Sequence, residues 1–416
     1  MISFLCIIVI NCSKDDEASN VPQQNEAPNT FNLIAVTNGA SDVDVLPSFS
    51  WQTAVDPDMD VVMYDLYLDT NPNPTTLHKQ DISGTNFKVE ERLYLVTDYY
   101  WKVTAKDSNG NTTESNVHKF TTRNLNFPLN PVTNSASFSE RSGHSTVSFQ
   151  NKFWVIGGSD GIASYKNDVL FSNNGSNWVV ATMAAAFIGR LSHTTTVFGN
   201  KIWVIGGAIP TASGSTVAND VWNSEDGITW VQVTSSAPFS ERALHTTTTF
   251  DNKLWVIGGL TSTGGGDLWF SADGITWTQV TISAPFSDRY GHTTTVFDNK
   301  LWLIGGYRSG GNYRNDIWSS TDGINWTEVT SSASFSPRRH HSVVVFDDKL
   351  WLFGGEDSAD LKNDVWSSTD GTNWTEVTSS ASFSERESHT MVVFDDKIWL
   401  IGGDDGDLKN DVWMMD

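Results

Sequence analysis

The chain has 416 residues, a formal net charge of −23 and a pI near 4.6. Phosphate backbones would repel such an acidic chain, and no basic stripe compensates, so nucleic acid is not expected as a partner. Its only cysteines, Cys6 and Cys12, lie at the N-terminus, so the body of the chain is free of disulfides. An acidic, disulfide-free β protein fits an exported bacterial surface protein, because high charge favours solubility.

The first residues have the pattern of an export signal. Residues 2–10 form an apolar run that is shorter than the roughly 20 residues of a transmembrane helix. Cys12 follows directly, in a pattern that resembles a bacterial lipoprotein cleavage site. We therefore expect residues 1–11 to be a lipoprotein signal peptide and Cys12 to be acylated. The alternative is a buried hydrophobic N-terminus.

The acidic residues after Cys12 resemble the tether that directs some lipoproteins to the outer face of the outer membrane. The expected location is therefore the cell surface, with membrane contact through the lipid anchor only. Residues 12–29 are polar, contain Pro22 and Pro28, and are expected to form a disordered acidic linker.

A first β domain is expected over residues 30–123. Segments 47–51, 64–68 and 99–105 alternate apolar and polar residues with period two, separated by turn residues, and they contain Trp51 and Trp101. This length and pattern favour a β-sandwich. The spacing of the aromatic residues around Trp101 resembles a fibronectin type III module, which would act as a spacer.

A unit of about 49 residues repeats six times in residues 124–416. Each copy begins with Arg-x-x-His and continues with a hydrophobic run that ends in Gly-Gly. An Asn/Asp-Asp pair and an Asp-Gly-x-x-Trp turn follow in most copies. The six starts are Arg141/His144, Arg190/His193, Arg242/His245, Arg289/His292, Arg338/His341 and Arg386/His389.

Each repeat is expected to fold as a four-stranded antiparallel blade. In the fourth repeat the strands are predicted at 292–297, 301–304, 316–319 and 326–330, with Gly305-Gly306 ending the second strand. Of the 18 tryptophans, 16 lie after residue 150, in register from repeat to repeat. We expect these rings to fill the space between adjacent sheets rather than to form a platform for glycans.

The sixth repeat stops after its third strand. Residues 130–138 match 327–335 almost position by position, so the segment before the first repeat is expected to supply the missing strand. Leu129 would then take the place of a tryptophan. The prediction is an all-β chain: a six-bladed β-propeller closed by an N-terminal strand, preceded by a β-sandwich.

The repeated Arg-x-x-His, Gly-Gly and tryptophan pattern resembles kelch repeats over about residues 125–416. The Asp-Gly-x-x-Trp turns are also similar to the Asp-box of sialidase-type propellers, although they are one residue shorter. Cytosolic kelch adaptors are a less favoured comparison, because they carry helical partner domains.

Residues that recur in all repeats are expected to be structural. Propeller symmetry spreads the six histidines around an axis, so they are expected to form hydrogen bonds rather than to ligate a metal. The Asn/Asp-Asp pairs are expected to bind turn amides. The arginines stay open, because in some kelch propellers they hold acidic peptide groups. Four of them follow an acidic residue that could neutralise them: Glu140, Glu241, Asp288 and Glu385.

Enzymatic chemistry is not specified by these motifs. An oxidase like the kelch enzyme galactose oxidase needs a tyrosine cross-linked to cysteine, and the body of the chain has no cysteine. A sialidase-like hydrolase or a sugar epimerase stays open as the alternative. No catalytic residue, cofactor or metal is therefore assigned, and the chain is expected to be a monomer that is not an enzyme.

Loop positions that differ between repeats are free of the demands of the fold. The early repeats have small polar residues there, whereas the fourth to sixth carry aromatic, basic and acidic residues. The predicted function is noncatalytic binding of an extracellular glycan or protein on this face. The predicted ligand residues are Tyr290, Tyr307, Arg308, Tyr313, Arg339 and Glu387.

Overall fold

The computed structural model describes residues 24–161, 164–262, 264–308 and 310–416. All regular structure in these residues is β, and no helix among them could cross a membrane. The chain divides into two compact units, Met1–Asn124 and Leu125–Asp416. The signal peptide, Cys12 and most of the linker lie outside the described residues.

The first unit contains two sheets that contribute to one hydrophobic core. Trp51, Trp101 and Phe49 are fully buried in that core. One sheet has the order β1 (Leu33–Ala35), β3 (Ser48–Trp51), β6 (Asn86–Lys88). The other has the order β2 (Ala40–Val43), β9 (His118–Thr122), β7 (Asp98–Lys106), β4 (Met63–Asp69), β5 (Leu77–Ile82), with β8 (Thr112–Glu114) also paired to β7.

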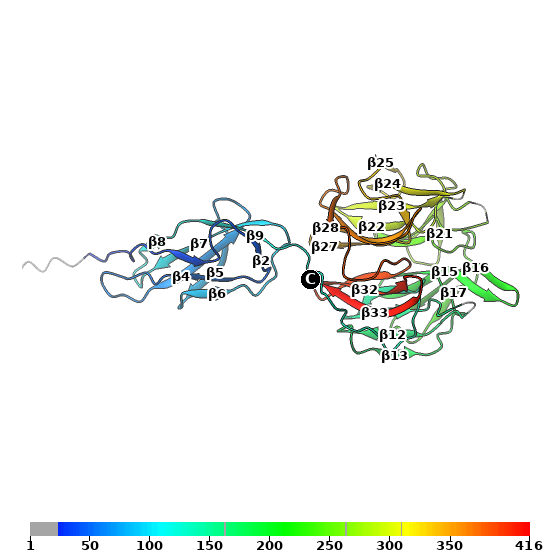
Figure 1. The fold of residues 1–416 in the computed structure, drawn as a ribbon, viewed down its shortest axis with the longest axis horizontal. Helices are drawn as coiled ribbons and strands as arrows, with labels where there is room; N and C mark the ends of the chain where they lie inside the picture. The colour runs from blue at the N-terminus through cyan, green and yellow to red at the C-terminus, as the bar shows by residue number, and fades with distance from the viewer. Residues whose placement is uncertain (1–23, 162–163, 263, 309) are drawn as a thin grey trace, which may run out of the picture. The chain divides into compact units, whose positions relative to one another are not determined.

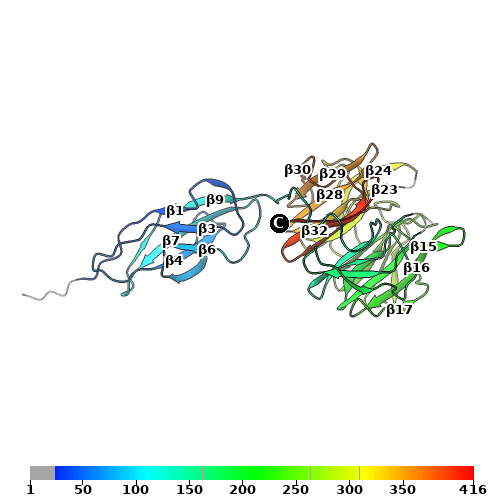
Figure 2. The same cartoon turned by 60° about the horizontal axis from the view of Figure 1, so that its bottom comes forward.

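The second unit consists of antiparallel sheets that follow the repeats, and we number them 1 to 6 in chain order (Figures 1 and 2). Sheet 1 has β10 (Ser145–Phe149), β11 (Lys152–Ile156), β12 (Val169–Ser172) and β13 (Val179–Thr182). Sheet 2 has β14 (Thr194–Phe198), β15 (Lys201–Thr211), β16 (Gly214–Ser224) and β17 (Val231–Thr234). Sheet 3 has β18 (Thr246–Phe250), β19 (Lys253–Ile257), β20 (Leu268–Ser271) and β21 (Trp277–Thr281).

Sheets 4 to 6 are built in the same way, except that sheet 5 has an additional short strand, β26, and sheet 6 has three strands. Sheet 4 has β22 (Thr293–Phe297), β23 (Lys300–Arg308), β24 (Asn312–Ser320) and β25 (Thr327–Thr330). Sheet 5 has β26 (Arg338–Arg339), β27 (Ser342–Phe346), β28 (Lys349–Asp357), β29 (Leu361–Ser368) and β30 (Thr375–Thr378). Sheet 6 has β31 (Thr390–Phe394), β32 (Lys397–Asp404) and β33 (Leu408–Met415).

Six strands, one from each sheet, contact one another in a cycle: β10, β14, β18, β22, β27 and β31, with β31 of sheet 6 also in contact with β10 of sheet 1. The residue before each repeated histidine donates its backbone N–H to the carbonyl of the corresponding residue in the previous repeat. These six bonds run from Gly143 to Ser388, Ser192 to Gly143, Leu244 to Ser192, Gly291 to Leu244, His340 to Gly291 and Ser388 to His340. The innermost loops thus form a closed chain of hydrogen bonds.

The segment that precedes the first repeat pairs with sheet 6. Thr133 bridges Val412 on β33, and Asn410 donates its side-chain amide to the carbonyls of Ala136 and Phe138. One part of the sequence prediction is wrong, because Leu129 is 87% exposed and does not occupy a buried tryptophan position. Backbone bonds join Asn126 to Asp416, and Val132 and Thr133 to Val412, and Leu129 lies between these contacts with its side chain exposed.

The paired glycines end the second strand in sheets 1 and 3 only, contrary to the prediction. In the other sheets the strand continues past them through a register shift, as in β23. Gly306 has φ +101°, and a Cβ there would lie 2.7 Å from the Cβ of His292. Glycine is therefore needed for the close approach of the histidine-bearing loop, not for strand termination.

The tryptophans fill the space between the sheets, as predicted. Trp255 on β19 is fully buried and packs with Trp326 and Leu301 of sheet 4. The turn glycine of the next repeat, Gly323, lies so close that a Cβ there would overlap the Trp255 ring. The Asp-Gly turns therefore pack against a tryptophan of the neighbouring sheet and hold the two sheets together.

Deletion of residues 125–136 from the full chain should destabilise the second unit by several kcal/mol, because sheet 6 loses a paired segment and its packing. The free energy of unfolding, followed by tryptophan fluorescence in denaturant, measures this. Deletion of residues 13–20 in the linker is the control. Equal stability of the two deletions would show that the pairing with β33 does not hold the unit together.

Candidate ligand site on the loop face

All six repeated arginines form structural ion pairs. Arg338 bonds to Asp364 on β29 through two parallel contacts of 2.6 and 2.7 Å, and to the carbonyl of Gly354 at 2.9 Å. Its guanidinium also lies 5.8 Å from the ring centre of Phe335. All six arginines are at most 2% exposed, so their guanidinium groups are not available to a ligand.

The partner of each arginine is the repeated aspartate of the same sheet, which lies on β16, β24, β29 and β33 and immediately before β12 and β20. The pairs are Arg141–Asp168, Arg190–Asp220, Arg242–Asp267, Arg289–Asp316, Arg338–Asp364 and Arg386–Asp411. The predictions that these aspartates bind turn amides, and that the acidic residue before an arginine neutralises it, are therefore wrong. Burial raises the pKa of Asp316, but its bonds with Arg289 outweigh burial and lower the pKa overall.

The six repeated histidines are buried, and the rings of five of them bond to a hydroxyl group of a neighbouring repeat, as predicted. His389 is the exception, because neither of its ring nitrogens has a hydrogen-bond partner in the described residues. Nε2 of His193 bonds to the hydroxyl of Ser145 in the previous repeat at 2.8 Å, and His245 bonds to Thr194 at 3.1 Å. Burial, followed by the charge of Arg190, lowers the pKa of His193 to about 3. A neutral histidine in this ring therefore links two sheets.

A different set of side chains gathers where the loops of sheets 4, 5 and 6 meet. We call it the loop cluster. Its members lie on the segments that precede the first strands and on the extended hairpins between the second and third strands. They are Tyr290, Tyr307, Tyr313, Arg339, His340, Glu356 and Glu387.

Arg339 is the centre of the loop cluster. It bonds to Glu356 Oε2 through Nε and Nη2, each at 2.7 Å. Its Cζ lies 4.9 Å from the ring centre of Tyr307 and 5.5 Å from that of Tyr313. Tyr290 completes the aromatic group, 5.4 Å from Tyr307. The result is a half-buried guanidinium beside two tyrosine rings, with Tyr290 packed behind Tyr307.

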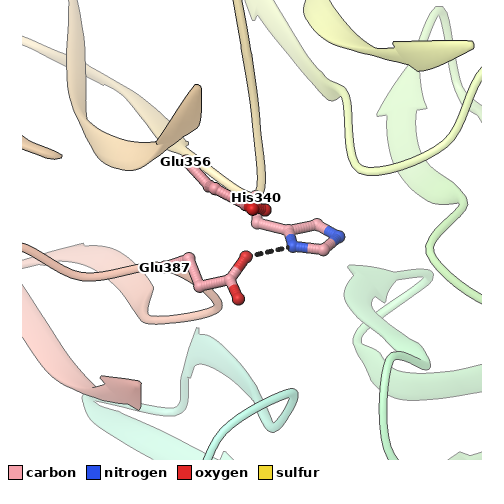
Figure 3. Close-up of side chains that lie close together, drawn as sticks. All are labelled: His340, Glu356 and Glu387. Atoms are coloured by element: carbon pink, nitrogen blue, oxygen red, sulfur yellow. Dashed lines mark hydrogen bonds and ion pairs between the residues drawn. The ribbon is translucent and has the colours of Figure 1, made fainter. Parts of the chain in front are cut away.

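Glu387 and His340 form a second pair within the loop cluster. His340 Nδ1 lies 2.6 Å from Glu387 Oε2, as Figure 3 shows. Burial raises the pKa of Glu387, but its bond with His340 and the charges of His340 and Arg339 outweigh burial and lower the pKa overall. One ligand atom from each of His340, Glu356 and Glu387 lies within 4.8 Å of the other two, so these three residues could hold a metal ion.

His340 also borders the central axis. A hollow of about 140 Å³ there is lined by the six repeated histidines and by His340. His340 has φ +52°, a conformation that Gly143 and Gly291 adopt at the same position of other repeats. The imidazole is therefore placed where the repeat otherwise has no large polar side chain.

The structure brings five of the six predicted ligand residues into the loop cluster. Arg308 lies apart, because its half-exposed side chain bonds to Asp288 at 3.2 Å. His340 and Glu356 were not among the predicted ligand residues. The signal that identifies them is the same as for the others, because both differ from the small or apolar residues at most equivalent positions of the other repeats.

Comparison with known proteins gives one family. The family model described as the KLHDC2/KLHL20/DRC7 Kelch-repeats domain matches residues 93–285 and 244–416. Among solved structures, one titled "Structure of YjhT" is similar over 67% of this chain and 95% of that chain, with 14% identity and a TM-score of 0.57. That similarity concerns the fold alone. No curated protein matches the sequence.

Proposed function

We propose that this chain, which belongs to the Kelch-repeats family of KLHDC2, KLHL20 and DRC7, is a noncatalytic binding module. The ligand binds at the loop cluster and is an extracellular glycan or protein. The tyrosine rings stack on the ligand, while Arg339 and Glu387 bond to its polar groups.

The observation that carries this proposal is the environment of Arg339 in the loop cluster. Its guanidinium lies against Tyr307 and Tyr313 and is held by Glu356, yet it is 24% exposed. Aromatic and arginine side chains that are held rigidly contribute most of the affinity in binding surfaces, because little side-chain entropy is lost on binding. The repeated arginines, by contrast, are fully paired.

The second candidate is a carbohydrate-active enzyme on the same face, either a sialidase-like hydrolase or an epimerase. The observation that favours it is the close His340–Glu387 pair, since acid–base catalysis needs adjacent titratable groups. We rank it below binding, because Glu356, the acidic residue that lies beside this pair, is already bonded to Arg339.

For the architecture we infer a six-bladed propeller closed by the segment before the first repeat, preceded by a fibronectin-like sandwich that acts as a spacer. The cyclic hydrogen bonds of the inner loops and the Thr133–Val412 bridge support closure. The common core of the two sheets in the first unit supports the sandwich. The molecule would bind its ligand as a monomer.

The double substitution Tyr307→Ala, Arg339→Ala should weaken ligand retention by roughly 30-fold or more, because it removes a ring and a charge from the centre of the site. The loss is measured by comparing the retention of wild-type and variant protein on a glycan array and on immobilised extracellular proteins of the source cell. Arg308→Ala is the control and should retain ligand as wild type does. Unchanged retention by the double variant would exclude this face, and sugar turnover would favour the enzyme.

We also propose that the chain is exported and held at the outer membrane by acyl chains on Cys12, facing outward. Each buried acyl methylene contributes about 0.8 kcal/mol to membrane attachment. Cys12→Ser should therefore release soluble protein, which fractionation of cells detects, whereas Cys6→Ser should leave the protein membrane-bound. A Cys12→Ser protein that stayed with the membrane would contradict the anchor.

A further inference from the structure

We propose that His340, Glu356 and Glu387 form a binding site for a divalent transition metal such as Zn²⁺. The proposal does not rest on the proposed ligand, since metal binding and ligand retention can each occur without the other. It also does not involve the six repeated histidines, five of which bond through their rings to neighbouring hydroxyl groups.

The residue types and their placement carry the inference. One imidazole nitrogen and two carboxylate oxygens lie within 4.8 Å of one another, and all three side chains are at most 25% exposed. Zinc is bound by histidine and carboxylate ligands at about 2.0–2.2 Å, which places neighbouring ligand atoms about 3.4 Å apart. The three side chains therefore need to move by about 1 Å for their ligand atoms to surround one ion.

The three ligands come from separate segments of sheets 5 and 6. Glu356 is on β28, His340 follows β26, and Glu387 lies in the segment that bridges β32 at Asp404. In Figure 3, His340 Nδ1 faces Glu387, whereas Nε2 points away from it. A metal at Nδ1 would replace the hydrogen bond to Glu387, and the proton of the neutral ring would then reside on Nε2.

The repeat supplies a comparison for each ligand. The position of His340 holds Gly143, Ser192, Leu244, Gly291 or Ser388 in the other repeats, and all of these form the same ring of backbone bonds. The fold therefore does not require an imidazole there. A histidine beside two half-buried glutamates, at a position that holds small or apolar residues in the other repeats, indicates a role other than folding.

The charges around the site favour a cation. Glu356 and Glu387 carry two negative charges; Arg339 bonds to Glu356, and its charge also acts on Glu387. Arg339 donates to Glu356 from outside the trio, as partners of metal-ligating carboxylates do. The two carboxylates and Arg339 leave one net negative charge, and a divalent ion would replace the hydrogen bond between His340 and Glu387.

The test is titration of metal-free, full-length protein with Zn²⁺ by isothermal calorimetry, with Co²⁺ absorption as a report of the ligand field. Wild type should bind one ion at this site. His340→Ser and Glu387→Gln should weaken that binding by about tenfold or more. Serine is compatible with the backbone, because Ser388 and Ser192 adopt the same positive φ.

Glu328→Gln is the matched control, since Glu328 is an exposed glutamate on β25 of the same unit, and it should bind the ion as wild type does. Circular dichroism shows whether each variant keeps its fold. Glu356→Gln is isosteric, so it tests the site if the other variants lose their fold. No binding by wild type, or equal binding by wild type and all three ligand variants, would overturn the site. Loss of metal binding by His340→Ser with unchanged ligand retention would leave the proposed function intact.

Discussion

The structure depends most on the buried pair between the repeated arginine and the repeated aspartate of the same sheet. Each pair joins the loop that enters a sheet to the third strand of that sheet, and the arginine also bonds to the first carbonyl of the Gly-Gly pair. A buried guanidinium is strongly destabilising unless every donor is satisfied. For Arg338 the aspartate, the glycine carbonyl and the carbonyl of Ser336, to which Nε donates, together meet that requirement and also fix the path of the loop.

This constraint explains where the molecule can vary. The residues on either side of the repeated arginine and histidine are held by backbone bonds, as in the Ser192–Gly143 link, so their side chains are free to differ. In sheets 1 to 3 most of them are small or apolar. In sheets 4 to 6 they include the tyrosines, Arg339, His340 and Glu387. One scaffold thus presents a particular set of side chains without a change in its own packing.

The sequence was sufficient to predict the repeat, the four strands of each sheet and the role of the tryptophans, because all of these recur with a fixed period. The kelch β-propeller is confirmed by the family match. The partner of the repeated arginines was not predictable, since the aspartate lies 25–30 residues away and meets the arginine only in the folded sheet. The sequence did not predict that Leu129 is exposed, because similarity between two segments does not show which of their side chains become buried against the neighbouring strand.

For the candidate site, the sequence indicated which loops differ but not which side chains meet. Arg308 and Arg339 look alike in the sequence, yet one bonds to Asp288 at the outer end of a hairpin and the other lies among the tyrosines. Hairpin register decides this, because it places Tyr307 opposite Tyr313 and Arg339 opposite Glu356. The pairing of His340 with Glu387 arises between two sheets, which no local pattern reveals.

The central claim is that arginines common to all repeats build the fold, whereas arginines particular to one repeat build the site. The most direct test compares the free energy of unfolding of Arg242→Met and Arg339→Met, followed by tryptophan fluorescence. Arg242→Met should lose about 3–5 kcal/mol, because it leaves Asp267 buried and uncompensated. Arg339→Met should lose about 1 kcal/mol or less. Equal losses, or a larger loss for Arg339→Met, would contradict the claim.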